Sequence, residues 1–208
     1  MNIIKPKMNI SETKSITDAC KEEYFYNYEF SSNIDKNITI SNTTIDSCIF
    51  NHINFSNIEL DNVDLINVIF KDCDLSNKCF DKKLISKVIF KNCKMTGVSF
   101  IDASLKDVYF DNTVSKYMNF TSSKMNNILF DKGILEEASF YEVNTKNIEF
   151  NEIDLLHTDF ISTSLKGVDF SNSDISKTSF DYYSLKGIIV DEFQCHSLVG
   201  MLGVEVKE

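Results

Sequence analysis

The fold of this chain is decided by the stretch FKNCKMTGVSFIDASLKDVYF, residues 90–110. Every fifth residue in it is large and apolar, from Phe90 through Met95, Phe100 and Leu105 to Phe110. A period of five differs from the roughly 3.6 residues of an α-helix and the roughly two residues of a β-strand. The stretch therefore predicts a chain that turns a corner every five residues, so that each fifth side chain points towards a common axis.

The same period extends through most of the sequence. Between Ile40 and Val190 there are 31 positions at five-residue spacing, and 29 of them are apolar, the exceptions being Ser115 and Thr145. Fourteen of the 17 Phe residues fall on these positions. Four corners would close a coil of about 20 residues, and a fixed period of about this length is typical of solenoids.

The period assigns an inside and an outside to the coil. The residue two before each centre also points inward and is often small, as at Cys73, Ala103 and Ala138, whereas the residue after each centre is mostly polar. Phe occupies nearly every multiple of ten from Phe70 to Phe180, and aliphatic residues usually take the positions between. This alternation predicts Phe on two opposite walls, with large residues facing small ones across a filled core.

The repeated unit resembles that of the pentapeptide repeat family: a small residue, then Asp, Asn or Ser, then Leu or Phe, then two variable residues. The resemblance covers about residues 31 to 190 and rests on the triplets Cys73-Asp74-Leu75, Ala103-Ser104-Leu105, Ala138-Ser139-Phe140, Thr158-Asp159-Phe160, Thr163-Ser164-Leu165 and Ser173-Asp174-Ile175. It implies an all-β solenoid, a right-handed quadrilateral parallel β-helix of about eight coils of 20 residues. The unbroken phase leaves no room for projecting loops, so the chain looks more like the loopless mycobacterial and Gram-positive members of the family.

Both ends of the chain lose the period, and solenoids need caps there because the last coils expose core and strand edges. Residues 1–30 are predicted to form an N-terminal cap, with a short helix that begins after Ser15 as N-cap. Residues 31–190 form the repeats, and residues 191–208 form a C-terminal cap with a short helix that Gly203 closes and a short strand after it.

The C-terminal helix is also the candidate interface of a homodimer. The family's topoisomerase-protecting members join through C-terminal elements of this kind, whereas a monomeric cap is the alternative. We expect four apolar side chains to share one face of the helix: Phe193, Leu198, Met201 and Leu202.

A stripe of apolar residues recurs every 20 residues at positions expected to face solvent. Its members precede a Phe centre by one position and are Ile49, Ile69, Ile89, Tyr109 and Leu129. A contiguous apolar strip often marks a contact surface. This apolar ladder is expected to be covered by the N-terminal segment or by another chain.

Acidic residues are concentrated in the C-terminal third of the chain. Between Asp131 and Glu192 there are 13 acidic and five basic residues, whereas the rest of the chain has 18 acidic and 16 basic ones. The outward carboxylates predicted there belong to Glu142, Glu149, Glu152, Asp154, Asp159, Asp169, Asp174 and Asp181. A second wall carries the opposite charge, at Lys106, Lys146, Lys166 and Lys186.

The resemblance and this charge together suggest a function. Quinolone-resistance members of the family are held to resemble DNA and to bind DNA gyrase or topoisomerase IV, and a long, narrow, negative rod fits a DNA-binding saddle. The chain is therefore predicted to be a DNA mimic that affects quinolone susceptibility. The alternatives are a structural or scaffolding module for another protein, and charge that only keeps the protein soluble.

Other function classes are disfavoured. A formal net charge of −10 argues against direct binding to nucleic acid. The sequence lacks catalytic motifs, and the histidines His52, His157 and His196 have no shared register, so no enzyme activity, metal or cofactor is predicted. The six cysteines lack metal-ligand spacing and are expected to be buried structural thiols. With no apolar run long enough to cross a bilayer, a soluble cytoplasmic protein is expected.

Overall fold

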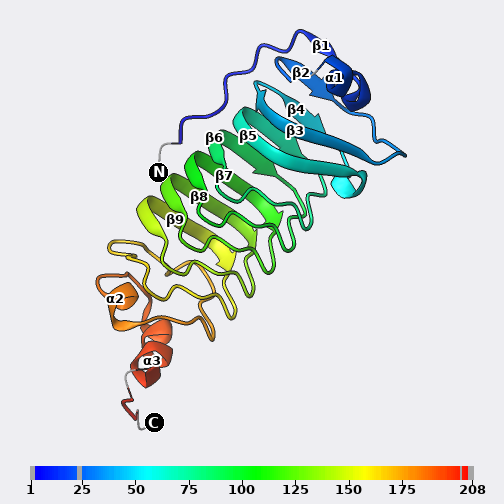
Figure 1. Cartoon of the computed structure of the whole chain (residues 1–208). Helices are drawn as coiled ribbons and strands as arrows, with labels where there is room; N and C mark the ends of the chain where they lie inside the picture. The colour runs from blue at the N-terminus through cyan, green and yellow to red at the C-terminus, as the bar shows by residue number, and fades with distance from the viewer. Residues whose placement is uncertain (1–2, 23–24, 202, 206–208) are drawn as a thin grey trace.

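The computed structural model describes residues 3–22, 25–201 and 203–205, except for the side chain of Met201. The described chain forms a solenoid of stacked coils with helices near both ends (Figure 1). Its elements, in chain order, are β1 (Glu12–Thr13), α1 (Ile16–Glu22), β2 (Tyr28–Phe30), β3 (Ile38–Asp46), β4 (Ile49–Asn51), the 3-10 turn η1 (Phe55–Asn57), β5 (Ile58–Lys71), β6 (Leu84–Lys91), β7 (Ser104–Val114), β8 (Lys124–Ile134), β9 (Asn144–Asp154), α2 (Tyr182–Leu185) and α3 (Glu192–Met201).

A parallel sheet connects the coils in the order β1-β2-β4-β5-β6-β7-β8-β9, and β3 also pairs with β5. Neighbouring coils pair at a spacing of 20 residues, as in Phe90↔Phe110, which confirms the predicted coil length. The spacing first appears at the bridge Tyr26↔Asp46 and reaches Asp169↔Ile189. β2, which lies in the segment predicted as the N-terminal cap, therefore already pairs with β4 in the register of the repeats.

The corners are formed by residues in the left-handed region of backbone conformation. Each of the 25 non-glycine residues described with positive φ lies two residues after a five-residue centre, for example Asn92 (φ 51°) and Asp102 (φ 56°). Asn and Asp tolerate this conformation better than other residues with a side chain. The Asn112 amide also donates to Asn92 Oδ1 at 2.9 Å, one coil away. Polar corner residues thus reverse the chain in a sequence that has only six Gly and one Pro.

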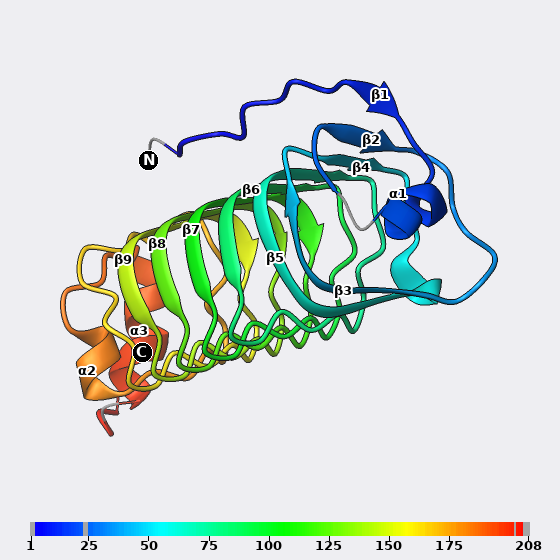
Figure 2. The same ribbon diagram turned by 45° about the horizontal axis from the view of Figure 1, so that its top comes forward.

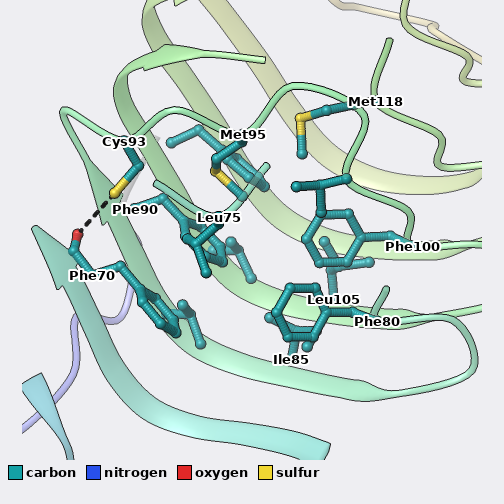
Figure 3. Close-up of a cluster of buried hydrophobic side chains, with 14 of the residues drawn as sticks. Phe70, Leu75, Phe80, Ile85, Phe90, Cys93, Met95, Phe100, Leu105 and Met118 are labelled. Atoms are coloured by element: carbon teal, nitrogen blue, oxygen red, sulfur yellow. Dashed lines mark hydrogen bonds between the residues drawn. The ribbon is translucent and has the colours of Figure 1, made fainter. Parts of the chain in front are cut away.

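The core is built from stacked Phe rings (Figure 3). Along one wall, Phe110 stacks on Phe90 at 5.1 Å and on Phe130 at 4.5 Å between ring centroids. Across the core it meets Phe120 edge to face, at 6.2 Å and 82°. The prediction of Phe on opposite walls is confirmed, but the expectation that large residues face small ones is wrong. The coil is narrow enough for opposed rings to touch, and edge-to-face contact suits their quadrupoles.

A helix lies at each end of the solenoid, α1 at the N-terminal end and α3 at the C-terminal end. At the N-terminal end, the Ser15 hydroxyl accepts from the Asp18 amide at 3.1 Å, and α1 buries Ile16 and Ala19. At the C-terminal end, Asp191 and Gln194 exchange side-chain and backbone hydrogen bonds that begin α3.

The Gln194 side-chain amide also supplies hydrogen bonds to backbone carbonyls at the C-terminal end of the solenoid. It donates to the carbonyls of Phe170 and Ser173, at 3.0 and 2.7 Å. Gly203, at φ 75°, donates to Gly200 and closes α3 as predicted. The short strand expected after it is not formed at Val204 and Glu205, and Val206 lies outside the described residues.

Candidate functional site

The eight predicted acidic residues do not lie on one wall. Four of them form two vertical pairs, because residues 20 apart occupy the same place in successive coils: Glu149 with Asp169, and Asp154 with Asp174. The bridge Asp154↔Asp174 shows the second pair directly. The remaining four occupy other columns. The carboxylates therefore lie on three of the four walls and at the corners of the C-terminal coils.

Most of these aspartates also hold the turns in place. Asp154, Asp159, Asp169 and Asp174 each accept a hydrogen bond from the backbone amide two residues further on, at 2.8–3.0 Å. Asp181 caps α2 through the Ser184 amide, at 2.7 Å. Sequence reasoning treated these residues as surface charges and missed this structural role, although Asp side chains are known to form turns by accepting from the backbone amide two residues further on.

The turn hydrogen bonds also keep the carboxylates charged. Hydrogen bonds from the Ser171 side chain and backbone lower the pKa of Asp169, and those from Ser176 lower the pKa of Asp174 in the same way. These two groups therefore remain ionised at neutral pH. Glu142 and Glu152 sit at corner positions with positive φ, and their side chains are exposed.

The lysines predicted on one wall do form a column there. Lys106 pairs with Asn126, which in turn pairs with Lys146 in β9. Lys166 and Lys186 continue the column, and all four lysines are exposed. Three of the five basic residues between Asp131 and Glu192 thus lie on this wall, and the 13 acidic residues lie on the other walls and at the corners.

The predicted C-terminal interface is only partly as expected. Phe193 is 77% exposed, whereas Leu198 is 9% exposed and packs into the core, so the prediction that they share one face is wrong. Five residues of helix rotate the side chain by about 140°, which separates the two. The side chain of Met201 and all of Leu202 lie outside the described residues.

The apolar ladder is formed in register. Ile49 pairs with Ile69, Ile69 with Ile89, Ile89 with Tyr109, and Tyr109 with Leu129. All five side chains are half-buried, although their positions point out of the solenoid. The Tyr109 hydroxyl donates to Asp131 Oδ2 at 2.9 Å.

Three of the six cysteines are buried, Cys48, Cys73 and Cys93, whereas Cys20 is half-buried and Cys79 and Cys195 are exposed. The expectation of six buried thiols is therefore wrong for the other three. Burial raises the pKa of Cys48 to about 11. The pKa of Cys93 is raised by a side-chain interaction with Cys73 and by burial. The Cys93 thiol donates to the Phe70 carbonyl (Figure 3). Buried thiols with raised pKa values are poor nucleophiles.

A surface hollow of about 580 Å³ lies between β9 and residues 164–168. It opens where Thr145 replaces an apolar centre and its hydroxyl donates to the Ser164 carbonyl at 2.6 Å. Its described lining includes one carboxylate, from Glu149, and one lysine, Lys166. The three histidines are exposed and lie outside this lining. No described helix is both long and apolar enough to cross a membrane.

The repeating corners, the stacked core and the 20-residue register define a parallel β-solenoid with a five-residue repeat. Comparison with known families agrees with this class. A profile described as pentapeptide repeat region matches residues 63–140, and one described as pentapeptide repeats (8 copies) matches residues 41–77 and 138–176. The chain belongs to the pentapeptide repeat family.

No curated protein matches the chain. Among solved structures, a trypsin-treated form of QnrB1, a plasmid-mediated fluoroquinolone resistance protein, has 19% identity and a TM-score of 0.49, and the match covers 96% of each chain. Rfr23, a pentapeptide repeat protein from the cyanobacterium Cyanothece 51142, has 10% identity and a TM-score of 0.42, over 59% of this chain and 91% of Rfr23.

HetL, a pentapeptide repeat protein involved in heterocyst differentiation regulation from Nostoc sp. strain PCC 7120, has 14% identity and a TM-score of 0.37. That match covers 80% of this chain and 89% of HetL. Family membership rests on the repeat profiles and on the register of the coils, not on these structural likenesses.

Proposed function

We propose that this chain is a non-catalytic protein-binding solenoid whose acidic C-terminal third mimics DNA and binds a type II topoisomerase, DNA gyrase or topoisomerase IV. The observation that carries the proposal is the distribution of charge. Residues 131–192 make up about three coils and have 13 acidic and five basic residues. Their carboxylates lie on three walls and at the corners of the rod, and those of the aspartates are fixed to a rigid scaffold by turn hydrogen bonds.

The density of this charge is close to that of duplex DNA. DNA carries about one negative charge per 1.7 Å of helix axis, or about 2.8 charges over the roughly 4.8 Å rise of one coil. The excess of eight acidic residues over about three coils gives roughly 2.6 negative charges per coil. A surface that accepts the DNA backbone would meet a similar field on this rod.

The lysine column determines which walls of the solenoid face the topoisomerase in this proposal. A partner that binds DNA is positively charged at its saddle and is repelled by the wall with Lys146 and Lys166. We therefore expect the lysine wall to face away from the topoisomerase, and the corners with Glu142 and Glu152 to contribute to the contact. The effect expected in the cell is reduced susceptibility to quinolones, because a topoisomerase held by the mimic is not held by DNA.

Charge reversal tests the proposal. We expect the double variant Glu142→Lys/Glu152→Lys to bind purified gyrase or topoisomerase IV at least about tenfold more weakly, because like charges across an interface are costly. Lysine is tolerated at these corners, since Lys132 adopts the same conformation at φ 59°. Binding is measured by surface plasmon resonance, and supercoiling and fluoroquinolone-induced cleavage are measured in parallel.

Glu59→Lys/Asp61→Lys is the matched control, because it makes the same change of net charge on two exposed residues of β5. This control should bind within about twofold of the unmodified protein. Equal loss in both variants would mean that only net charge matters. An unmodified protein that neither binds nor protects either topoisomerase at micromolar concentration would leave the scaffolding role for another protein partner.

We also propose that the chain forms a homodimer through its C-terminal end, which would lengthen the acidic rod. The last coil and the helices expose large apolar side chains, which sequence reasoning missed apart from Phe193: Tyr182, Tyr183, Ile189 and Phe193. Tyr182 is 80% exposed. A set of exposed apolar residues is typical of contact surfaces.

The mass in solution tests the dimer. We expect the unmodified protein to elute as a dimer in size-exclusion chromatography with light scattering, and Tyr182→Ser/Phe193→Ser to elute as a monomer. Tyr117→Ser is the control, because Tyr117 is an exposed aromatic residue on a corner in the middle of the rod. A monomeric unmodified protein at tens of micromolar, or a dimer in all variants, contradicts the proposed interface.

A further inference from the structure

The N-terminal segment, residues 3–11, runs back along the outside of the solenoid. From β1 it passes beside the coils towards β7 and β8, and both views show this path (Figures 1 and 2). At its far end the Ile4 amide donates to Asp107 Oδ1 at 3.4 Å. At its near end the Ser11 amide donates to the Asn27 carbonyl at 2.8 Å, next to β2. The segment is therefore held at both ends.

The length of the segment suits this path. The nine residue-to-residue steps from Ile4 to Thr13 reach about 30 Å when extended. Glu29, which pairs with Thr13, and Tyr109, next to Asp107, are four coils apart, which is about 19 Å at the spacing of paired strands. The segment can therefore cross every coil between its two anchors.

The side chains of the segment alternate. Pro6, Met8 and Ile10 are half-buried, whereas Lys7 and Asn9 between them are exposed. Residues two apart on an extended chain point to the same side. One face of the segment is thus apolar and turned towards the solenoid, and the other is polar and turned towards solvent.

The ladder column is less exposed beside the segment than at the far end of the solenoid. Its five residues and Glu149 are half-buried, whereas Asp169 and Ile189, further along the same column, are exposed. The corner residue Asp107, beside the end of the segment, is also more buried than its neighbours. It is fully buried, although Lys87 and Asn127, its neighbours in the same corner column, are only half-buried.

From these observations we infer that the ladder is a binding groove for the chain's own N-terminal segment. Pro6, Met8 and Ile10 pack against Ile49, Ile69, Ile89 and Tyr109, and Asp107 anchors the far end through the Ile4 amide. The contact is intramolecular, and it keeps the ladder from binding other proteins. It goes beyond the proposed topoisomerase contact, which lies on other walls and does not depend on it.

Limited proteolysis of the full-length protein tests the inference. Lys7 lies in the segment, and trypsin cleaves after it only when the segment is released, so the rate reports the released fraction. We expect Ile10→Asp to raise this rate at least about tenfold, because it places a charge on the apolar face. Asn9→Asp adds the same charge one residue away on the exposed face, and the rate should stay within about twofold.

The ladder side of the contact supplies a reciprocal test. Ile69→Ser/Ile89→Ser should also raise the cleavage rate after Lys7 about tenfold, although these residues are far from Lys7 in sequence. Val114→Ser is the control, because Val114 is an exposed outward residue on a different wall. Circular dichroism and melting temperature show that each variant is folded.

Two results would overturn the inference. In the first, Ile10→Asp and the ladder variant are cleaved after Lys7 no faster than their controls. In the second, the rate for the unmodified protein rises on dilution while its mass falls from dimer to monomer. That second result would place the segment on the ladder of another copy.

Discussion

Phe110→Ala is expected to lower the free energy of unfolding by about 3–5 kcal/mol. Phe110 is fully buried and contacts four other rings, two stacked along its own wall and two edge to face across the core. Removing the ring deletes all four contacts and leaves a cavity in the middle of the rod. The rigid walls cannot close it, because each coil is held in register by its neighbours on both sides.

Urea unfolding followed by circular dichroism measures this loss. Phe193→Ala is the control, because the same side chain is removed where it is mostly exposed, and its effect should stay below about 0.5 kcal/mol. Equal effects of the two substitutions would show that the stacked rings do not carry the stability of the solenoid. Phe180→Ala should lie between them, because Phe180 is less deeply buried and lies in the last coil.

The coil could be predicted from the sequence because its signal is repeated. Each five-residue unit places one large residue inward, and about thirty such units in phase leave a single register. The corner every five residues and the cap at Ser15 followed from the same kind of local rule. Where a residue's place depends only on its own unit, sequence and structure agree.

Features that depend on packing between distant parts were not predictable in this way. The contact between Ile4 and Asp107 joins residues 103 positions apart, and only three alternating side chains mark the segment. Opposed Phe rings touch because the coil is narrow, and the width of the coil cannot be predicted from a single five-residue repeat. Phe193 and Leu198 were assigned to one face by composition, without the roughly 100° rotation per residue that separates them.

The candidate site shows the same division. The acidic residues and the lysine column could be counted from the sequence, and the 20-residue register placed them in columns. That Asp154 and Asp174 hold turns through backbone hydrogen bonds appeared only with the structure. This role makes Glu142 and Glu152 better residues for charge reversal, because their substitution leaves the turns intact.

Gly133→Ala is expected to lower the free energy of unfolding by roughly 2–6 kcal/mol, through backbone strain and a steric clash of about 1–3 kcal/mol each. Gly133 lies in β8 between Thr113 and Ile153 of the neighbouring coils. Its φ of +137° is one that residues with a side chain rarely adopt, and an added Cβ would lie 2.3 Å from the Thr113 carbonyl oxygen. Neither coil can yield without breaking its pairing to the next one.

Substitutions at two other glycines separate the effect of backbone strain from that of the steric clash. Gly167→Ala keeps the strain, at φ +83°, but meets nothing within 4 Å, so it should cost only about 1–3 kcal/mol. Gly200→Ala in α3 has neither strain nor clash, and should raise stability by up to about 1 kcal/mol, because alanine favours helix. The expected order of stability is Gly200→Ala, then Gly167→Ala, then Gly133→Ala. If Gly133→Ala cost no more than Gly167→Ala, the coils would be able to separate locally, and the rod would be less rigid than its register implies.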